Sequence, residues 1–188
     1  MNVYETIRNR RTIRKFKQQR IERGILEKLI DAARFAPSSS NMQPLKYMIV
    51  DEPGMAARIF EYVKWAGYIT PAGNPDEGEK PVAFIIILVD SEIRASGYEL
   101  DIGAAAQSIF LAAEEEGIGT CWMGAIDKER IRSILVISER FIINTVIALG
   151  YSGESPVTED EKGSIKYYKD GSGVLHVPKR KLTDIIIK

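Results

Sequence analysis

Apolar positions three and four residues apart mark the faces of two helices. The first helix is expected to end near Ala36, because Pro37 disfavours helical geometry in the residue before it. The second helix runs from Leu100 to Glu116, and Gly117 is placed to cap its C-terminus. Their apolar stripes are Leu26, Leu29, Ile30 and Ala33 in the first, and Ile102, Ala105, Ala106, Ile109 and Ala113 in the second.

Two apolar runs predict buried strands. Val82 to Val89 contains no polar residue, which is typical of a strand that is covered on both faces. Phe141 to Leu149 is the second run, and shorter strands are predicted at Tyr47 to Val50 and at Thr120 to Met123. Helices and strands alternate irregularly, without a repeat or a linker. This pattern predicts one layered α/β or α+β domain over residues 1–188, with a mixed sheet.

Capping residues and composition place the remaining elements. Asn2 and Glu5 have the spacing of a capping box, and Asp127 can cap a helix that follows it. Loops are indicated by proline, glycine and charged residues. The predicted helices are Val3 to about Arg10, residues 54–68 and Lys128 to Leu135, and the predicted loops are 71–81 and 152–173.

Charge and composition exclude several classes of function. The 188 residues include 26 basic and 26 acidic ones, and this zero net charge argues against bulk nucleic-acid binding. The longest apolar run, Val82 to Val89, is too short to cross a bilayer. A single cysteine, Cys121, and a single histidine, His176, exclude an internal disulfide framework and a metal centre built from several such ligands. The N-terminus lacks the pattern of a signal peptide, so a cytoplasmic location is expected.

The basic run Arg10-Arg11-Thr12-Ile13-Arg14 is the first candidate for binding chemistry. Several guanidinium groups and a hydroxyl at the end of a short helix suit a phosphate dianion, which arginine can bind bidentately. The alternative is a solvated helix end, where cations are favoured in any case. Taken alone, the run fits that alternative better.

Two other stretches are ambiguous in the same way. Pro37-Ser38-Ser39-Ser40-Asn41-Met42-Gln43-Pro44 places polar side chains where they could surround a flat heteroaromatic ring, but an ordinary capped loop has the same composition. Gly117-Ile118-Gly119-Thr120-Cys121-Trp122-Met123-Gly124 has glycines that would let a ligand approach the backbone. Taken alone, its large side chains fit a core position better.

Taken together, the types and order of these stretches resemble the nitroreductase family of flavoproteins. The resemblance spans nearly the whole chain. The matching stretches are Arg10 to Phe16, Ala36 to Pro44, Asp101 to Ala106, Gly117 to Gly124, Ala148 to Tyr151 and Pro178 to Leu182.

The resemblance implies an α+β fold with a mixed β-sheet flanked by helices, built as an intertwined homodimer with FMN at the interface. It implies that Arg10, Arg11, Thr12 and Arg14 hold the FMN phosphate and ribityl chain, joined by Lys179 and Arg180. It further implies that Pro37, Ser38, Ser39, Asn41 and Gln43 border the isoalloxazine from the second copy, while Cys121, Trp122, Met123 and Gly124 line its other side, with backbone groups near the reactive edge.

The implied activity is an FMN-dependent oxidoreductase. It would use NADH or NADPH to reduce nitroaromatics, quinones or similar electron-poor small molecules by two-electron ping-pong transfer. No catalytic side chain is assigned, because the cofactor carries this chemistry. The segment from Phe60 to Lys80, with Lys64, Trp65 and Tyr68, is a candidate for substrate contact; a surface helix with buried aromatics is the alternative.

Two departures and two rival functions stand beside this interpretation. Leu45 occupies a position where many relatives have tryptophan, and Gln107 one where asparagine is frequent, so the placement of ring and substrate is open. One rival is a specialised relative, such as a reductive dehalogenase or a heterocycle dehydrogenase. The other is a flavin-binding module without nicotinamide turnover. The short chain has no large insertion, which favours the generic reductase. Neither nucleic acid, nor membrane, nor metal is expected as a partner.

Overall fold

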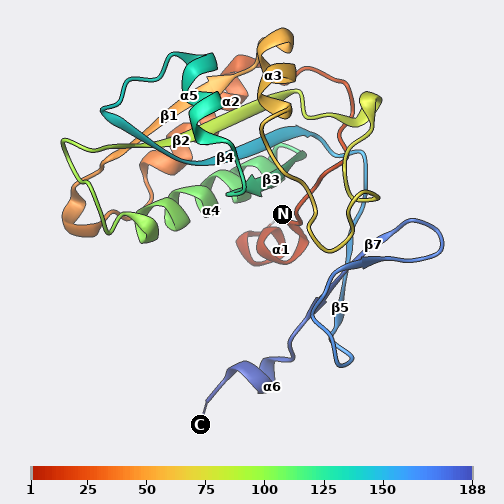
Figure 1. The fold of residues 1–188 in the computed structure, drawn as a ribbon. Helices are drawn as coiled ribbons and strands as arrows, with labels where there is room; N and C mark the ends of the chain where they lie inside the picture. The colour runs from red at the N-terminus through yellow and green to blue at the C-terminus, as the bar shows by residue number, and fades with distance from the viewer. Residues whose placement is uncertain (1, 188) are drawn as a thin grey trace.

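The structure is a computed structural model that describes residues 2–187. A sheet with helices on both faces forms the body, and a C-terminal arm leaves it (Figure 1). The helices are α1 (Val3–Asn9), α2 (Arg23–Arg34), α3 (Pro53–Phe60), α4 (Glu99–Glu115), α5 (Lys128–Leu135) and α6 (Leu182–Ile185), with short 3-10 helices at Ser39–Asn41 and Glu77–Glu79. The strands are β1 (Leu45–Val50), β2 (Ala83–Asp90), β3 (Ile118–Met123), β4 (Phe141–Tyr151), β5 (Val157–Asp160), β6 (Tyr168–Lys169) and β7 (Leu175–Lys179).

The four-stranded sheet has the order β1-β2-β4-β3, and each neighbouring pair is antiparallel. All residues of β2 are buried, as its continuous apolar sequence predicts. Ile85 and Ile87 face α2 and α4, whereas Phe84 and Ile86 face α3 and α5, so the sheet separates two apolar cores. The α+β class is confirmed. Parallel pairing occurs at the β3 edge of this sheet, in the isolated Thr12–Thr120 bridge, and between β5 and β7 in the arm.

The prediction of one helix over residues 54–68 is wrong beyond Phe60. The Lys64 N–H donates to the carbonyl of Ala125 at 3.0 Å, and the Asp127 N–H donates to the carbonyl of Tyr62 at 2.9 Å. These bonds take the place of helical ones. They join the segment after α3 to the residues that precede α5, and a local pattern of apolar residues does not encode such a long-range pairing.

Glycines in β3 and β4 make room for the N-terminal segment. The Ile13 N–H donates to the carbonyl of Thr120 at 2.9 Å. A Cβ atom at Gly119 would lie 2.8 Å from the Cβ of Ile13, and one at Gly150 would lie 2.8 Å from the Cβ of Phe16. The sequence left open whether this glycine lets a ligand approach the backbone. In the structure, the Ile13 side chain occupies the space beside Gly119.

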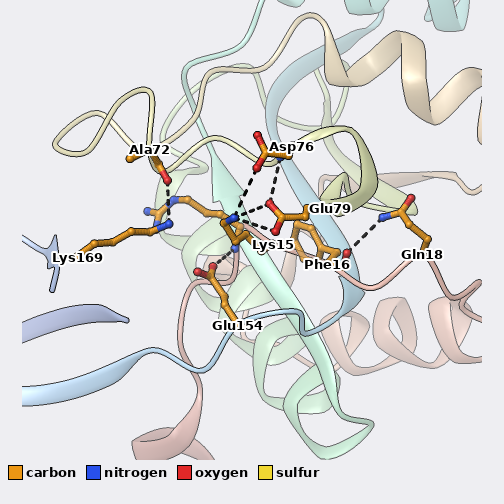
Figure 2. Close-up of polar contacts among 9 residues, drawn as sticks. Lys15, Phe16, Gln18, Ala72, Asp76, Glu79, Glu154 and Lys169 are labelled. Carbon is orange, nitrogen blue, oxygen red and sulfur yellow. Dashed lines mark hydrogen bonds and ion pairs between the residues drawn. The ribbon is translucent and has the colours of Figure 1, made fainter. Parts of the chain in front are cut away.

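Lys15 ties the loop of residues 71–81 to this segment. Figure 2 shows its ammonium between Glu79, at 2.6 Å, and Asp76, at 3.9 Å. The hydrogen bond to Glu79 raises the pKa of Lys15, and the same bond lowers the pKa of Glu79. Lys169 approaches the loop from the arm and donates to the carbonyl of Ala72 at 2.8 Å. The loop is thus held at both ends.

The C-terminal arm, residues 156–187, projects from the body in Figure 1. Its apolar end is open to solvent in the single chain: Leu182, Ile185, Ile186 and Ile187 are between 57% and 97% exposed. Ile185 to Ile187 therefore do not belong to the core of their own chain. No helix within residues 2–187 has the length and apolar character needed to span a membrane.

The contact between Gly119 and Ile13 predicts a stability effect. Gly119→Ala should lower the free energy of unfolding by about 1–3 kcal/mol, because the new methyl group overlaps the Ile13 side chain. The control is Gly24→Ala in α2, where nothing lies within 4 Å of the added Cβ. Denaturant unfolding of both variants measures the difference. Equal unfolding free energies for the two variants would show that Gly119 is not needed for this packing.

Candidate functional site

Three cations from the two ends of the chain gather beside α4. The Arg10 guanidinium lies over the ring of Phe110, 5.6 Å from its centroid. Arg11 donates to the hydroxyl of Thr158 in β5 at 3.3 Å. Lys179, the last residue of β7, is close enough that partial burial and the charges of Arg11 and Arg10 lower its pKa. We call Arg10, Arg11 and Lys179 the cationic cluster.

The cationic cluster lacks a carboxylate partner. Within residues 2–187, no carboxylate oxygen lies within 4.0 Å of the charged nitrogens of Arg10, Arg11 or Lys179. Burial lowers the pKa of both arginines, and Glu114 acts on them only at longer range. Arg180 is exposed next to Lys179. Partly desolvated like charges are stabilised by a bound anion, so this donor set suits a phosphate group.

Arg14 is not part of the cationic cluster and lies against the C-terminal arm. Its guanidinium lies over the ring of Tyr167, at 5.0 Å from the centroid, and its backbone N–H donates to Glu154 at 2.6 Å. The Arg14 Nε is buried and has no hydrogen-bond partner in the described part of the chain. Buried donors are normally paired, so this N–H is an unsatisfied donor within residues 2–187. Thr12 contributes a backbone bridge to Thr120.

The side chains of β3 alternate between the two faces of the sheet. Trp122 is 47% exposed and packs on Phe110, with 5.7 Å between the ring centroids. Cys121 and Met123 point the other way, into the core that contains Ile13. Burial raises the pKa of the Cys121 thiol to about 11. Of the predicted ring-lining residues, Trp122 and Gly124 are therefore exposed, whereas Cys121 and Met123 can offer a ligand only their backbone.

Asp101, in the first turn of α4, anchors the serine-rich loop of residues 37–43. Its Oδ2 accepts from the Ser38 hydroxyl at 2.6 Å, and its Oδ1 accepts from the backbone and the hydroxyl of Ser39, both at 3.1 Å. The Ser38 oxygen in turn accepts from the Gln43 N–H at 2.9 Å. Burial alone would raise the pKa of Asp101, but the hydrogen bonds from the two serines hold it below its ordinary value.

The exposed part of this loop has an unusual backbone. Ser40, Asn41 and Gln43 have φ angles of 52°, 53° and 50°, in the left-handed region that non-glycine residues seldom adopt. The Gln43 amide donates to the Asn41 side chain at 2.9 Å, and both residues are exposed, as is Pro37. Strain of this kind is concentrated at functional sites. The two serine hydroxyls are directed at Asp101, so the loop presents its amides and backbone.

The loop and the cationic cluster lie at opposite ends of α4. Asp101 is in the first turn and Glu114 in the last, which separates them by about 20 Å along the helix axis. One chain therefore does not bring the two predicted parts of the site together. The sequence assigned no role to Asp101 or Phe110. The signal for Asp101 was an acidic residue at the start of a predicted helix, and the serine-rich loop of residues 37–43 precedes that helix in the sequence.

Of the segment from Phe60 to Lys80, Tyr68 rather than Trp65 faces solvent. Trp65 packs on Phe60, with ring centroids 5.6 Å apart, in the core beneath α3. Tyr68 is 60% exposed and packs on Tyr167 of the arm at 4.9 Å. Lys64 and Gln107 are also exposed, whereas Leu45 packs against the core formed with α2 and α4.

His176 lies between two carboxylates within the arm. Its Nδ1 is 3.3 Å from Glu159 in β5, and its Nε2 is 3.1 Å from Asp170, which follows β6. The ring also stacks on Tyr168 at 4.9 Å. Asp170 and Glu159 raise the pKa of His176. His176 thus joins the three strands of the sheet that ends in Lys179.

Comparison with known proteins decides the family. The sequence profile of the Nitroreductase family matches residues 7–151. The chain belongs to the nitroreductase family. This confirms the resemblance drawn from the ordered motifs and makes the chain an oxidoreductase. A Methanothermobacter thermautotrophicus protein, provisionally named NADH dehydrogenase/NAD(P)H nitroreductase, is 32% identical over 165 residues, which are 85% of this chain and 82% of that protein.

Solved nitroreductase structures share the fold. An FMN-dependent nitroreductase from Clostridium difficile is 26% identical, with a TM-score of 0.65, and the match covers 89% of this chain and 92% of that one. A provisionally named nitroreductase from Desulfovibrio desulfuricans, solved in complex with FMN, matches 100% of this chain and 96% of its own with a TM-score of 0.72. At 21% identity, the latter likeness is one of fold.

The buried Asp101 carboxylate predicts a pH-dependent stability effect. Asp101→Asn should lower the free energy of unfolding at neutral pH by about 1.5–3 kcal/mol, since hydrogen bonds to a charged acceptor are lost. The folded pKa is lowered, so the stabilisation is present above the ordinary value of about 3.9 and disappears as the pH falls through the folded pKa. The control is Asp31→Asn at an exposed ion pair. Urea titrations at several pH values measure the unfolding free energy of each variant. An equal loss of stability in Asp101→Asn and Asp31→Asn would contradict the role of Asp101.

The pKa of His176 can be measured directly, because the chain has one histidine and so one imidazole signal. NMR titration should give a pKa above the ordinary value of about 6.5, and Asp170→Asn should lower it. Since the folded pKa is raised, the stabilisation of the arm is complete below the unfolded value and is lost as the pH rises through the folded value. An unshifted pKa in the wild type would contradict the bridged geometry.

Proposed function

We propose that the chain is an FMN-dependent oxidoreductase that uses NADH or NADPH to reduce electron-poor small molecules such as nitroaromatics or quinones. The observation that carries this proposal is the cationic cluster: the half-buried Arg10 and Arg11 converge with Lys179, and no carboxylate within residues 2–187 pairs with them. The relative named as an NAD(P)H nitroreductase and the similar FMN-dependent enzyme support it. Bound FMN would supply two-electron redox chemistry, which the side chains lack.

The residues present fit the cofactor. The phosphate dianion would be held by the cationic cluster, with Arg180 and the Thr12 hydroxyl beside it. The unpaired Nε of Arg14 is a donor for an acceptor on the ribityl chain or the ring. Trp122 and Phe110 provide an aromatic surface next to Arg10. Each of these groups binds or orients; none of them has to change its protonation state.

A second copy of the chain would complete the site. The loop of residues 37–43 lies about 20 Å from the cluster along α4, so its exposed amides would border the isoalloxazine of the partner rather than that of its own chain. The exposed apolar end of the arm, from Leu182 to Ile187, is suited to burial against that partner. The proposed unit is therefore one FMN-binding domain per chain in an intertwined homodimer, with Asp101 as a positioning residue.

The titratable side chains favour a mechanism in which water supplies the protons. His176 is held between Glu159 and Asp170 in the arm, and the Cys121 thiol is buried and neutral at pH 7 because its pKa is about 11. Nicotinamide and acceptor would use the same face of the site in turn, which is the ping-pong order. The chain's own contribution would be to bind the phosphate, orient the ring and limit the access of water.

The phosphate assignment is tested by Arg10→Ala combined with Lys179→Ala. Loss of two charge-assisted contacts of about 1.5–3 kcal/mol each should weaken FMN binding by roughly 100-fold or more. Flavin fluorescence titration of the apoprotein measures the affinity, and circular dichroism checks the fold. Arg58→Ala with Lys128→Ala removes the same charge from exposed positions and should leave the affinity unchanged. Full FMN affinity in the Arg10 and Lys179 variant would overturn the assignment.

A further inference from the structure

A hollow lies between residues 67–69 and the C-terminal arm. Its volume is about 630 Å³, within the range of small-molecule sites. Ile69 and Pro178 contribute apolar surface to it. The remaining lining is chiefly aromatic and charged: Tyr68, Tyr167, Tyr168, Lys162, Lys166 and Glu159.

The aromatic rings of the hollow are held in place by contacts with other side chains. Tyr68 and Tyr167 pack at 4.9 Å, and the Arg14 guanidinium lies over Tyr167 at 5.0 Å. Tyr168 stacks on His176 with 13° between the ring planes. Tyr68 and Tyr168 nevertheless remain 60% and 42% exposed. Fixed, exposed aromatic faces favour a planar ligand, because little side-chain entropy is lost on stacking.

The charge balance of the hollow is positive. The Lys166 ammonium lies 5.7 Å from the centroid of Tyr68, and no carboxylate oxygen of residues 2–187 comes within 4.0 Å of Lys162 or Lys166. The one acidic residue of the lining, Glu159, accepts from the Tyr168 hydroxyl at 2.9 Å and lies 3.3 Å from His176. The hydrogen bonds with Tyr168 and His176 and the nearby charge of Lys162 lower the pKa of Glu159. With two lysines against one carboxylate, the lining keeps a net positive charge for a ligand.

We propose that this hollow binds planar aromatic anions, with the ring against Tyr68 or Tyr168 and a carboxylate near Lys162 and Lys166. A neutral ring would leave the two ammonium groups unpaired, and a small anion such as phosphate would leave the aromatic faces uncovered. Arg14 lies on Tyr167, so the hollow adjoins the proposed cofactor site. This inference rests on the proposed function. In the proposed reductase, aromatic acceptors that bear an acidic group would be preferred substrates.

Binding of benzoate to the FMN-loaded protein tests the site without turnover, because benzoate carries no reducible nitro or quinone group. Calorimetry or ligand-observed NMR should show benzoate binding several-fold more tightly than benzyl alcohol, acetate or inorganic phosphate. Benzyl alcohol has the ring without the charge, and acetate and phosphate have the charge without the ring. If acetate or phosphate binds as well as benzoate, the hollow is a general anion site and the proposal is wrong.

Matched variants assign the binding to the hollow. Lys162→Gln with Lys166→Gln should weaken benzoate binding about 3- to 10-fold, the range expected for two exposed ion pairs. Lys17→Gln with Lys128→Gln makes the same change of net charge at exposed positions elsewhere and should have no effect. Tyr68→Leu should weaken both benzoate and benzyl alcohol. Benzoate that binds elsewhere, such as on the flavin, would be unaffected by the first variant, and that result overturns the proposal.

Turnover separates this inference from the proposed function. With NADH or NADPH, the Lys162 and Lys166 variant should lose kcat/KM for 4-nitrobenzoate but not for nitrobenzene. An equal loss for both acceptors contradicts the site while leaving the reductase intact. Lysine-dependent benzoate binding in a protein that reduces no acceptor supports the site and contradicts the proposed function.

Discussion

The absence of side chains at Gly119 and Gly150 lets Ile13 and Phe16 lie directly against the sheet, and the candidate site depends on that contact. The segment that carries these two residues also carries every arginine of the N-terminal motif. Because Ile13 is hydrogen-bonded to β3, Arg10 lies over Phe110 of α4 and Arg14 lies over Tyr167 of the arm. A packing requirement in the core therefore sets the positions of charges at the surface.

Like-charge repulsion is the cost of this arrangement. Burial lowers the pKa of Arg10, and burial together with the neighbouring cations lowers the pKa of Arg11 and of Lys179. No ion pair within residues 2–187 offsets this. The arm is stabilised by other contacts, including His176 between Glu159 and Asp170. A fold that gathers cations in this way is more stable with an anion bound, which would couple the arm to the proposed cofactor.

Elements whose signals are local could be predicted from the sequence. The α5 helix begins after Asp127 as the capping residue indicates, and β2 is buried along its whole length as its apolar run indicates. The break after Phe60 could not be predicted, because it depends on pairing with residues 125–127. The resemblance to the nitroreductase family led to the expectation that Lys179 lies near Arg10 and Arg11. These residues are distant in the sequence, and no local pattern indicates that they meet.

The orientation of side chains was harder to predict than their proximity. Cys121 and Trp122 are neighbours in one motif, yet strand alternation buries the first and exposes the second. The serines of the 37–43 loop were expected to face a ring, but Asp101, from a distant helix turn, takes both hydroxyls. Such details depend on tertiary partners. A composition rich in serine and asparagine predicts a loop without predicting what the loop binds.

The central claim is that the cationic cluster recognises the phosphate of FMN, and riboflavin tests it most directly because it has the same ring and ribityl chain without the phosphate. Titration of the apoprotein with each flavin, at one salt concentration, gives the two dissociation constants. The account predicts that FMN binds roughly 100-fold or more tightly than riboflavin, since at least two charge-assisted contacts belong to the phosphate alone. Equal affinity for the two flavins would contradict it.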